Sequence, residues 1–539
     1  MSAYNAYPQG QINVQNGNIN HYYEDFVVPG HGFELALERS YNSLSNFSGM
    51  FGHKWGSNFD IDFNLTPEGT VEITEYGGGF KTTFAPKNFN QNSINEFVKN
   101  LYNKIPESSK SANLEASLKK DAKLRHKLAK EYKMSTEVAL NTTFYANDRG
   151  PESLEKIQKK GFERMTWVRT FGDGRKEYFN SEGKLIRRED SNNNYLKLSY
   201  NNEGLLSTVA DATGRQITFE YYPDKKVKMV TSPIGKKCHY RYDTGNLISA
   251  KNDRGFEFNY TYDQRHRMIE VKYPKEEKET MGYDDLNRIT THAGPEEILT
   301  RYKYDTRGDP DKYFNVIVSK EIGKKPNQVV TVDKYEYEFG RRENGTRYTY
   351  KLATLLDGVK TETAYTPCCG KPISITKQGL TTRFDYWPNG ALKKKTFPSG
   401  ETVSLEYDEK VGKVAKVTQE DPKLKASDTT FYQYDTKGNL AYAKNETKKI
   451  YVQLIYDTKG RIKELIDQAG KKINFDYNEL GKPTKIALEG VGSISVSYSA
   501  NGEITNVKST GGRKIAAEVT TTFQTLLDVI RPAGVSLNI

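Results

Sequence analysis

Regularly spaced carboxylates are the first residues in this 539-residue sequence that could do chemistry. Aspartate follows tyrosine at Tyr434-Asp435 and again at Tyr456-Asp457. Two carboxyl groups flanking a glycosidic bond would suit glycoside hydrolysis. The same residue type, however, recurs in one predicted turn after another, where its side chain can accept hydrogen bonds from the backbone that follows. The repetition therefore favours a role in turns over catalysis.

Cysteines and histidines give weaker chemical signals. Cys368 and Cys369 are adjacent, Cys238 is remote in sequence, and no nearby histidine completes a zinc set. We expect free, structural thiols, because a bridge from Cys238 would need Cα atoms within about 7 Å. His31 and His53 have no carboxylate or cysteine beside them at metal spacing, so we expect structural or exposed histidines. The sequence therefore predicts no metal site.

Motifs of several enzyme classes are also missing from the sequence. It has no Gly-x-Ser-x-Gly, no His-Glu-x-x-His and no phosphate-binding loop. We therefore expect a protein that is not an enzyme, with no catalytic residues and no cofactor. A hydrolase that acts on a cell-surface polymer, through a site that the sequence does not reveal, stays open as a third hypothesis.

The turns that carry the aspartates belong to a repeat of about 21 residues. Tyr434, Tyr456, Tyr477 and Tyr498 follow one another at steps of 22, 21 and 21 residues, and similar steps separate tyrosines further upstream. Apolar and polar residues alternate before each tyrosine, which predicts a half-buried strand. After the turn, apolar residues three apart predict a bulge. Each unit therefore holds two strands and two turns, and a period of this length indicates a repetitive architecture.

The turn motif is Tyr-Asp-x-x-Gly, with Asn in place of Asp in some repeats and a glycine that can take positive φ. A modified turn at 366–372 contains the paired cysteines. We assign structural turn roles to the following residues: Tyr242, Asp243, Gly245, Tyr304, Asp305, Gly308, Tyr386, Gly390, Tyr434, Asp435, Gly438, Tyr456, Asp457, Gly460, Tyr477, Asn478 and Gly481.

The repeat resembles the YD repeat of Rhs proteins, of teneurins and of the shell-forming subunits of insecticidal Tc toxin complexes. Residues 17–43, with Asp25, Pro29 and Arg39, are similar to the segment that opens Rhs proteins, and Phe-Gly-His-Lys-Trp55 resembles the element that follows it. The resemblance covers residues 10–86 and 164–510. It implies a mainly β fold, in which a long antiparallel sheet of YD repeats coils into a hollow or partly open shell.

Residues 87–163 interrupt the tyrosine pattern. Leucines from Leu114 to Leu128 lie near one helical face, with lysines around the others. A proline near the start and a glycine at the end of 151–161 predict a further helix. We expect a helical insertion that forms a surface arm, a plug or a cap.

The remaining segments complete the predicted organisation. Residues 1–86 form an N-terminal Rhs-type β segment. Residues 164–510 form the repeat shell, with longer strands or an inserted hairpin over an irregular part at 311–350. Residues 511–539 form a capping segment, with a strand and a short helix over 516–530.

Composition limits the choice of partners and location. Net charge is +11, but the lysines are scattered over the repeats, where they protect strand edges, so we expect no nucleic-acid binding. Aromatic residues make up 12% of the chain, which argues against disorder. No apolar run is long enough for a transmembrane helix, and no signal peptide is visible in this chain. We expect a secreted or cell-surface protein.

Two further hypotheses about function follow from the resemblance. The first is a non-enzymatic scaffold that interacts with another cell, a surface glycan or a partner protein. The alternative is an Rhs-type carrier whose shell encloses the helical insertion or a separate toxic cargo. Many Rhs proteins end the shell with an Asp-Pro self-cleavage motif, but Asp309-Pro310 and Asp421-Pro422 lack that context here.

Overall fold

A computed structural model describes residues 10–530, apart from 147–151, 159–164, 297, 307, 324–327, 343–346 and 368–369. Cys368 and Cys369, and the prediction made for their thiols, lie outside the described residues. Cys238 is a buried free cysteine.

Most of the chain forms one antiparallel sheet in which every strand pairs with its neighbours in sequence. Its strands are β7 (Ile61–Leu65), β8 (Val71–Glu75), β9 (Phe80–Pro86), β10 (Thr143–Ala146), β11 (Ser153–Lys156), β12 (Trp167–Thr170), β13 (Lys176–Phe179), β14 (Leu185–Glu189), β15 (Tyr195–Tyr200), β16 (Leu206–Asp211), β17 (Gln216–Tyr221), β18 (Val227–Thr231), β19 (Lys237–Asp243), β20 (Asn246–Lys251), β21 (Glu257–Tyr262), β22 (Met268–Lys272), β23 (Lys278–Tyr283), β24 (Ile289–Ala293), β25 (Leu299–Asp305), β26 (Tyr313–Ile322), β27 (Val329–Arg341), β28 (Arg347–Leu356), β29 (Val359–Tyr365), β30 (Pro372–Lys377), β31 (Leu380–Tyr386), β32 (Leu392–Thr396), β33 (Thr402–Tyr407), β34 (Val414–Asp421), β35 (Ala426–Tyr434), β36 (Leu440–Asn445), β37 (Ile450–Tyr456), β38 (Ile462–Asp467), β39 (Lys472–Tyr477), β40 (Pro483–Leu488), β41 (Gly492–Tyr498) and β42 (Ile504–Ser509). A short 3-10 helix, Pro274–Glu276, lies between β22 and β23.

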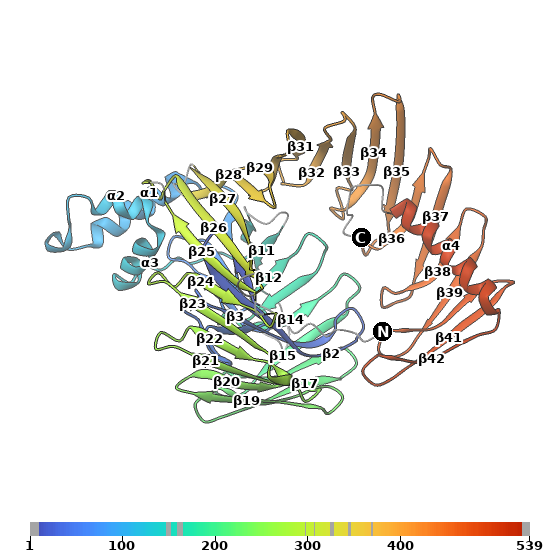
Figure 1. Ribbon diagram of the computed structural model, residues 1–539, viewed down its shortest axis with the longest axis horizontal. Helices are drawn as coiled ribbons and strands as arrows, with labels where there is room; N and C mark the ends of the chain where they lie inside the picture. Colours follow the sequence, from blue (N-terminus) through green and yellow to red (C-terminus); the bar gives the residue numbers. More distant parts are fainter. Residues whose placement is uncertain are drawn as a thin grey trace.

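This sheet coils around a central space, as Figure 1 shows. A sheet of this many strands must curl, because strand twist accumulates. The strand order is that of a barrel. Within the described residues, however, no register pairs β7 directly with β42: β7 pairs with β8, and β42 pairs with β41. The strand β42 is exposed along its length. The mainly β, coiled architecture predicted from the repeats is confirmed.

The repeat itself has the predicted bulge. Tyr456 lies opposite Ile462, whereas Ile455 lies opposite Glu464, so the second strand holds one extra residue just after the turn. The extra residue explains why Ile462 and Leu465, three apart, both contribute to the apolar core. The same register shift recurs at most of the repeat tyrosines.

A separate small sheet precedes the shell and packs inside it. It consists of β1 (Gln11–Asn13), β2 (Asn18–Val28), β3 (Leu35–Asn42) and β6 (Trp55–Ser57), with the β4–β5 ladder (Ser48–Gly49, Gly52–His53) beside it. Its apolar residues join one core with strands of the first half of the shell. The prediction of a single β segment over 1–86 needs correction, because β7, β8 and β9 already belong to the large sheet.

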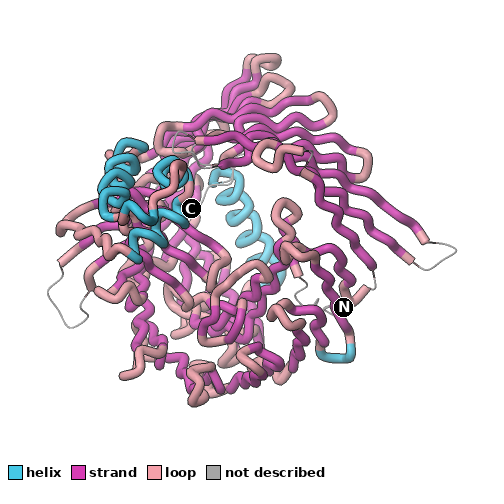
Figure 2. The backbone as a smooth tube through the Cα atoms, turned by 90° about the vertical axis from the view of Figure 1, so that its left-hand side faces the viewer, coloured by secondary structure: helices cyan, strands magenta, loops and turns pink. Residues whose placement is uncertain are grey.

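Helices α1 (Gln91–Lys104), α2 (Leu114–Lys120) and α3 (Ala122–Glu131), with the 3-10 turn Glu107–Ser109, form an arm between β9 and β10. Figures 1 and 2 show this arm outside the coil of strands. The arm has its own small apolar core, which includes Val98, Leu101 and Leu118. Of the three forms predicted for the insertion, the structure shows the surface arm.

The boundaries predicted for the insertion were too wide. Ser153–Lys156 is a strand, not a helix, and pairs with both β10 and β12. Pairing on two sides outweighs the local helix signals, which are weak evidence alone. Of the other residues of 151–161, only 152, 157 and 158 are described, and none of these three is helical.

Two later predictions had different outcomes. The irregular part at 311–350 consists of the long strands β26, β27 and β28, as predicted. The strand predicted after residue 516 is wrong, because α4 (Gly512–Ile530) is one continuous helix. Ile515 and Val519, four residues apart, pack on one side of it, which is helical spacing.

Candidate functional site

The tyrosines of the repeat turns join one repeat to the next. The Tyr456 hydroxyl donates to the carbonyl of Leu440 at 2.8 Å, and the Tyr477 hydroxyl donates to that of Ile462 at 2.6 Å. Burial raises the pKa of Tyr434 to about 12, so its hydroxyl stays a donor in neutral solution. The hydroxyls of Tyr304, Tyr386 and Tyr434 make the corresponding bonds to Ile289, Pro372 and Val414.

The next residue of the motif closes the turn. Oδ1 of Asp457 accepts from the backbone N–H groups of Lys459 and Arg461, at 2.9 and 3.0 Å. Asp435 and Asn478 make equivalent bonds. The turn glycines have positive φ, which is open to glycine at little cost: Gly308, Gly390, Gly438, Gly460 and Gly481.

Two repeats depart from this geometry. Asp243 lies in β19 opposite Asn246, so the turn is shortened to Thr244 and Gly245. The carbonyl of Gly245 accepts from the backbone N–H of His53, and Tyr242 lies with its hydroxyl 3.5 Å from the carbonyl of Met50. At this turn, Met50 and His53 thus make the contacts, in place of the hydrogen bonds seen at the other repeat turns. At the other site, Asp305 ends β25 opposite Asn315, where the strands lengthen.

These turn residues do not gather into a catalytic centre. They lie in successive turns of the sheet, and Asp457 is paired with Arg461 at 2.6 Å. The described part of the chain contains no group of three or more His, Cys, Asp or Glu side chains suited to a metal ion. The geometry assigns the motif to the shell's construction.

The opening segment places a buried ion pair inside the shell, which was not predicted. Arg39 on β3 donates to both carboxylate oxygens of Asp25 on β2, at 2.5 and 2.8 Å, and Tyr240 on β19 donates to Asp25 at 2.6 Å. Arg39 is fully buried and lies over four aromatic rings, with centroids 5.1–5.9 Å away. Desolvation lowers the pKa of Arg39, but the charge and hydrogen bond of Asp25, together with the nearby Tyr260 and Tyr240, outweigh it and raise this pKa. The rings belong to Tyr23, Phe51, Trp55 and Tyr240.

A second buried polar cluster surrounds Glu279 on β23. One carboxylate oxygen accepts from His292 at 2.6 Å and from the backbone N–H of Gly10 at 3.0 Å, and it lies 3.1 Å from Nε2 of His21. Tyr273 bonds the other oxygen. Burial opposes ionisation, but His21 and the surrounding hydrogen bonds outweigh it and lower the pKa of Glu279. Both clusters fasten the inner sheet to the shell wall.

Sequence signals for these clusters existed but were incomplete. Asp25 and Arg39 interrupt apolar strands and belong to the segment that carries the Rhs resemblance. Trp55, predicted as a core residue, is fully buried. Glu279 and His292 had no such marker, because they meet His21 only after the sheet has coiled.

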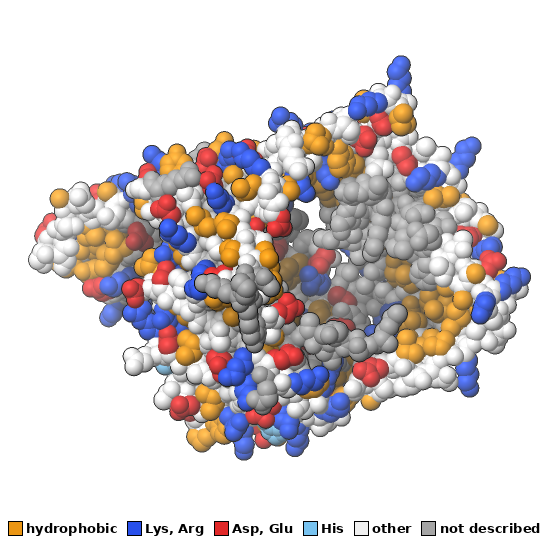
Figure 3. Space-filling view, in the orientation of Figure 1, with side chains coloured by type: hydrophobic (Ala, Val, Ile, Leu, Met, Phe, Trp, Pro, Cys, Tyr) orange, Lys and Arg blue, Asp and Glu red, His pale blue; other side chains and the backbone are white. Residues whose placement is uncertain are grey.

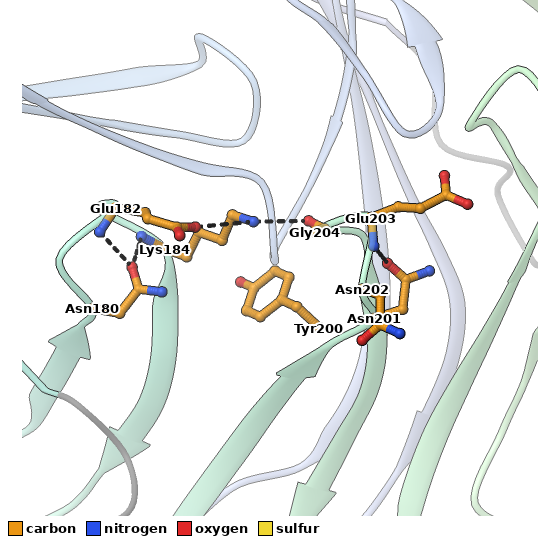
Figure 4. A pocket seen from close by; sticks show the side chains of 8 residues that line it. All are labelled: Asn180, Glu182, Lys184, Tyr200, Asn201, Asn202, Glu203 and Gly204. Atoms are coloured by element: carbon orange, nitrogen blue, oxygen red, sulfur yellow. Dashed lines mark hydrogen bonds and ion pairs between the residues drawn. The ribbon is translucent and has the colours of Figure 1, made fainter.

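A polar pocket lies on the surface of the shell. It has a volume of about 390 Å³ and lies between two neighbouring turns, where Lys184 donates to the carbonyl of Gly204 at 3.1 Å (Figure 4). Its lining residues are Asn180, Glu182, Lys184, Tyr200, Asn201, Asn202, Glu203 and Gly204. This pocket offers no nucleophile paired with a base, so the central space is the better candidate for function.

The apolar face of the repeats faces this central space. Tyr240 and Tyr260, each two residues before a repeat tyrosine, pack against the inner sheet. Leu454 occupies the same repeat position in the second half and shares a core with Ile515 and Val519 of α4. Figure 2 shows α4 within the ring of strands, and Figure 3 shows Lys and Arg side chains spread around the outer rim of the molecule. The opposite face, with Gln453 and Ile455, is exposed.

A coiled sheet of tyrosine-marked repeats around a central space defines a β-shell protein. The family model of the teneurin YD-shell matches residues 412–536, and that of DUF6531, a domain of unknown function, matches residues 9–78. The chain therefore carries a YD-shell region together with a DUF6531 segment, and the resemblance to Rhs and YD-repeat proteins is confirmed.

A bacterial deaminase toxin and a bacterial tRNA nuclease are among the proteins similar to this chain. Double-stranded DNA deaminase toxin A of Burkholderia cenocepacia (strain H111) is 24% identical over 181 residues, which is 30% of this chain and 12% of that protein. The tRNA nuclease WapA of Bacillus subtilis (strain 168) is 24% identical over 286 residues, which is 46% of this chain and 12% of that protein. The match thus spans about an eighth of each relative.

Matches among solved structures cover more of the chain. The crystal structure of TcdB2-TccC3-TEV covers 93% of this chain and 33% of that chain, with 10% identity and a TM-score of 0.44. The crystal structure of TcdB2-TccC3 without the hypervariable C-terminal region covers 93% of this chain and 32% of that chain, with 11% identity and a TM-score of 0.44. None of the described helices is long and apolar enough to span a membrane.

Proposed function

We propose that this chain forms the container of a toxin-carrying protein, a shell that encloses a cargo segment or a separate cargo protein. The observation that carries the proposal is α4, which follows the last strand of the shell and lies within the ring of strands (Figure 2). Ile515 and Val519 hold it against the inner apolar face. The helix that follows the last strand of the shell thus lies on the inner face.

The similar proteins support the same proposal. Their names describe a DNA deaminase toxin and a tRNA nuclease, and this chain matches only 12% of each. Activities of those whole proteins are not assigned to this chain. We propose that its own part is containment without catalysis, and that it works as a secreted or cell-surface protein, where a toxin meets another cell.

The version of the carrier hypothesis in which the shell encloses the helical insertion needs correction. The arm formed by α1, α2 and α3 lies outside the shell (Figure 1). The arm favours a second function, the predicted interaction with another cell, a glycan or a partner protein. Exposed lysines on α3, Lys123, Lys127 and Lys130, would suit an anionic partner.

A protected reporter tests containment. An unstructured reporter peptide with protease sites is fused after residue 539, and a matched chain carries the same reporter between Ser108 and Ser109 of the exposed turn in the arm. The proposal predicts slow cleavage of the first reporter and rapid cleavage of the second. Equal cleavage rates, with both shells intact on a gel, would reject containment.

The second function is tested separately by replacing residues 91–131 with a short Gly/Ser linker, which leaves β10 and β11 in place. Loss of binding to anionic polysaccharide with unchanged reporter protection would assign partner binding to the arm. Binding that survives the deletion would remove the arm from that role.

A further inference from the structure

The two halves of the shell meet turn against turn along a line that we call the seam. On one side lie the β14–β15 turn (190–194), the β16–β17 turn (211–215) and the loop 29–32 of the inner sheet. On the other side lie the turns 435–439, 457–461, 478–482 and 499–503 of the last repeats. We propose that the seam is the gate of the shell and that acid opens it through His31.

Amide groups make the direct bonds of the seam. Asn192 and Asn439 donate to each other's side-chain oxygens, both at 3.0 Å, although they are 247 residues apart. Asn194 donates to the carbonyl of Lys459 at 2.9 Å. These few polar bonds are the kind that can be exchanged for water at little net cost.

Turn glycines allow the close approach. A Cβ on Gly460 would collide with the side chain of Asn192, and one on Gly481 would lie 3.0 Å from the carbonyl oxygen of Gly30. The glycine that each repeat needs for positive φ therefore also lets the opposite turn come near.

His31 lies at the centre of this contact and is 8% exposed. An N–H of Arg461 donates to its Nδ1 at 3.3 Å, which requires a neutral imidazole with a free lone pair on that nitrogen. On the same side, Arg215 donates to the carbonyl of Pro29 at 2.8 Å, which holds the loop in place. Protonation of Nδ1 would remove the bond to Arg461 and leave two cations in contact.

The surrounding charges are mixed, but the carboxylates already have partners. Burial, and then Lys459, Arg461 and Arg215, lower the pKa of His31, while Asp211 raises it. Asp211 is bound to Arg215 and Asp457 to Arg461, both as ion pairs. The charged residues of the turns around His31 are Asp190, Asp211, Arg215, Asp457, Lys459, Arg461, Glu479 and Lys482.

The direction of the pH effect follows from this shift. In an open seam His31 is hydrated and titrates near its ordinary pKa of about 6.5. In the closed seam its pKa is lower, so the open state binds more protons between the two values. The closed seam is therefore favoured above about pH 6.5 and is progressively lost as pH falls below it.

Spin labels across the seam test this inference in the full chain. Labels are placed at Ser191→Cys and Lys437→Cys in a chain with C368S and C369S, since Cys238 is buried. We expect a narrow short distance at about pH 8 and a growing longer component at about pH 5. The variant H31Q should stay closed at both values, whereas H239Q, which changes an exposed histidine on β19, should open like the parent.

A further variant guards against misfolding of H31Q. Lys459→Gln removes one cation near His31 but keeps the backbone carbonyl that Asn194 uses, so opening should need lower pH. Opening in H31Q at the parent's pH, or no opening in the parent, would overturn the proposal. The role of the seam as a gate rests on the proposed container. The distances between the spin labels are measured without any cargo, so the acid-opened seam and the container can each be rejected independently of the other.

Discussion

Hydroxyl groups of the repeat tyrosines, and not only their rings, bind one repeat to the next. In most repeats the hydroxyl donates to a carbonyl at the bulge of the preceding repeat, as Tyr456 does to Leu440. A carbonyl that loses a hydrogen-bond donor in a partly buried place is costly, so the hydroxyl contributes to the joint between repeats. This explains at the residue scale why tyrosine, and not phenylalanine, marks the period.

The substitution Tyr456→Phe should lower the free energy of unfolding by about 1 kcal/mol, because it leaves the Leu440 carbonyl without its donor. Urea denaturation followed by tryptophan fluorescence measures the change. Tyr451→Phe, at a tyrosine of the same strand whose hydroxyl makes no hydrogen bond to the described residues, should change it by only a few tenths of a kcal/mol. Equal losses in both variants would contradict the structural role of the Tyr456 hydroxyl.

The substitution Arg39→Met should be far more damaging, by about 3–5 kcal/mol, because it leaves the Asp25 carboxylate buried without its partner. Arg241→Met, which breaks the exposed pair with Glu257, is the control and should cost about 1 kcal/mol or less. The same urea titration compares them. A loss below about 1 kcal/mol for R39M would mean that this buried pair does not stabilise the inner sheet.

At the scale of elements, the strands were predictable and the arm's limits were not. Period-two alternation and turn glycines mark each strand locally, so the sequence suffices for the array. Ser153–Lys156 became a strand through pairing with β10 and β12, and α4 became one helix on the inner face; both depend on neighbours that the local pattern does not contain. Arg39, Asp25 and Glu279 were missed as partners for the same reason.

The arm should be the first part of the protein that trypsin cuts. Lys104 and Lys133 are exposed where the helices end, whereas the shell strands from β8 to β41 are paired on both sides. Mass spectrometry over the first minutes should therefore find cuts at these lysines before any cut in the repeats. Cuts that appear first within 164–510 would contradict an external arm.

Release of the arm from the shell should speed this cleavage. Arg125 on α3 is ion-paired with Glu68 in the β7–β8 turn. Arg125→Gln should therefore increase the rate of cutting at Lys133, and Lys127→Gln, at an exposed lysine of the same helix, should leave it unchanged. Identical rates in the two variants would mean that the ion pair does not hold the arm.

At the scale of the whole molecule, the inner face is the surface on which the proposed container depends. The same repeat position faces inward in both halves, where it meets the inner sheet in one and α4 in the other. The repeat predicts a coiled sheet, but the pairing of Asn192 with Asn439 across 247 residues, and hence the seam, depends on how far the sheet curls. The local sequence does not specify how far the sheet curls.

Size-selective labelling of neighbouring residues on β41 tests the enclosed interior most directly. Val496→Cys lies on the inner face beside Ile494, and Ser497→Cys lies on the exposed outer face; both are made with C368S and C369S. A small maleimide should label both variants, whereas a maleimide on a bulky polyethylene glycol chain should label only Ser497→Cys. Equal labelling of both variants by the bulky reagent, in a folded shell, would contradict an enclosed interior and with it the container.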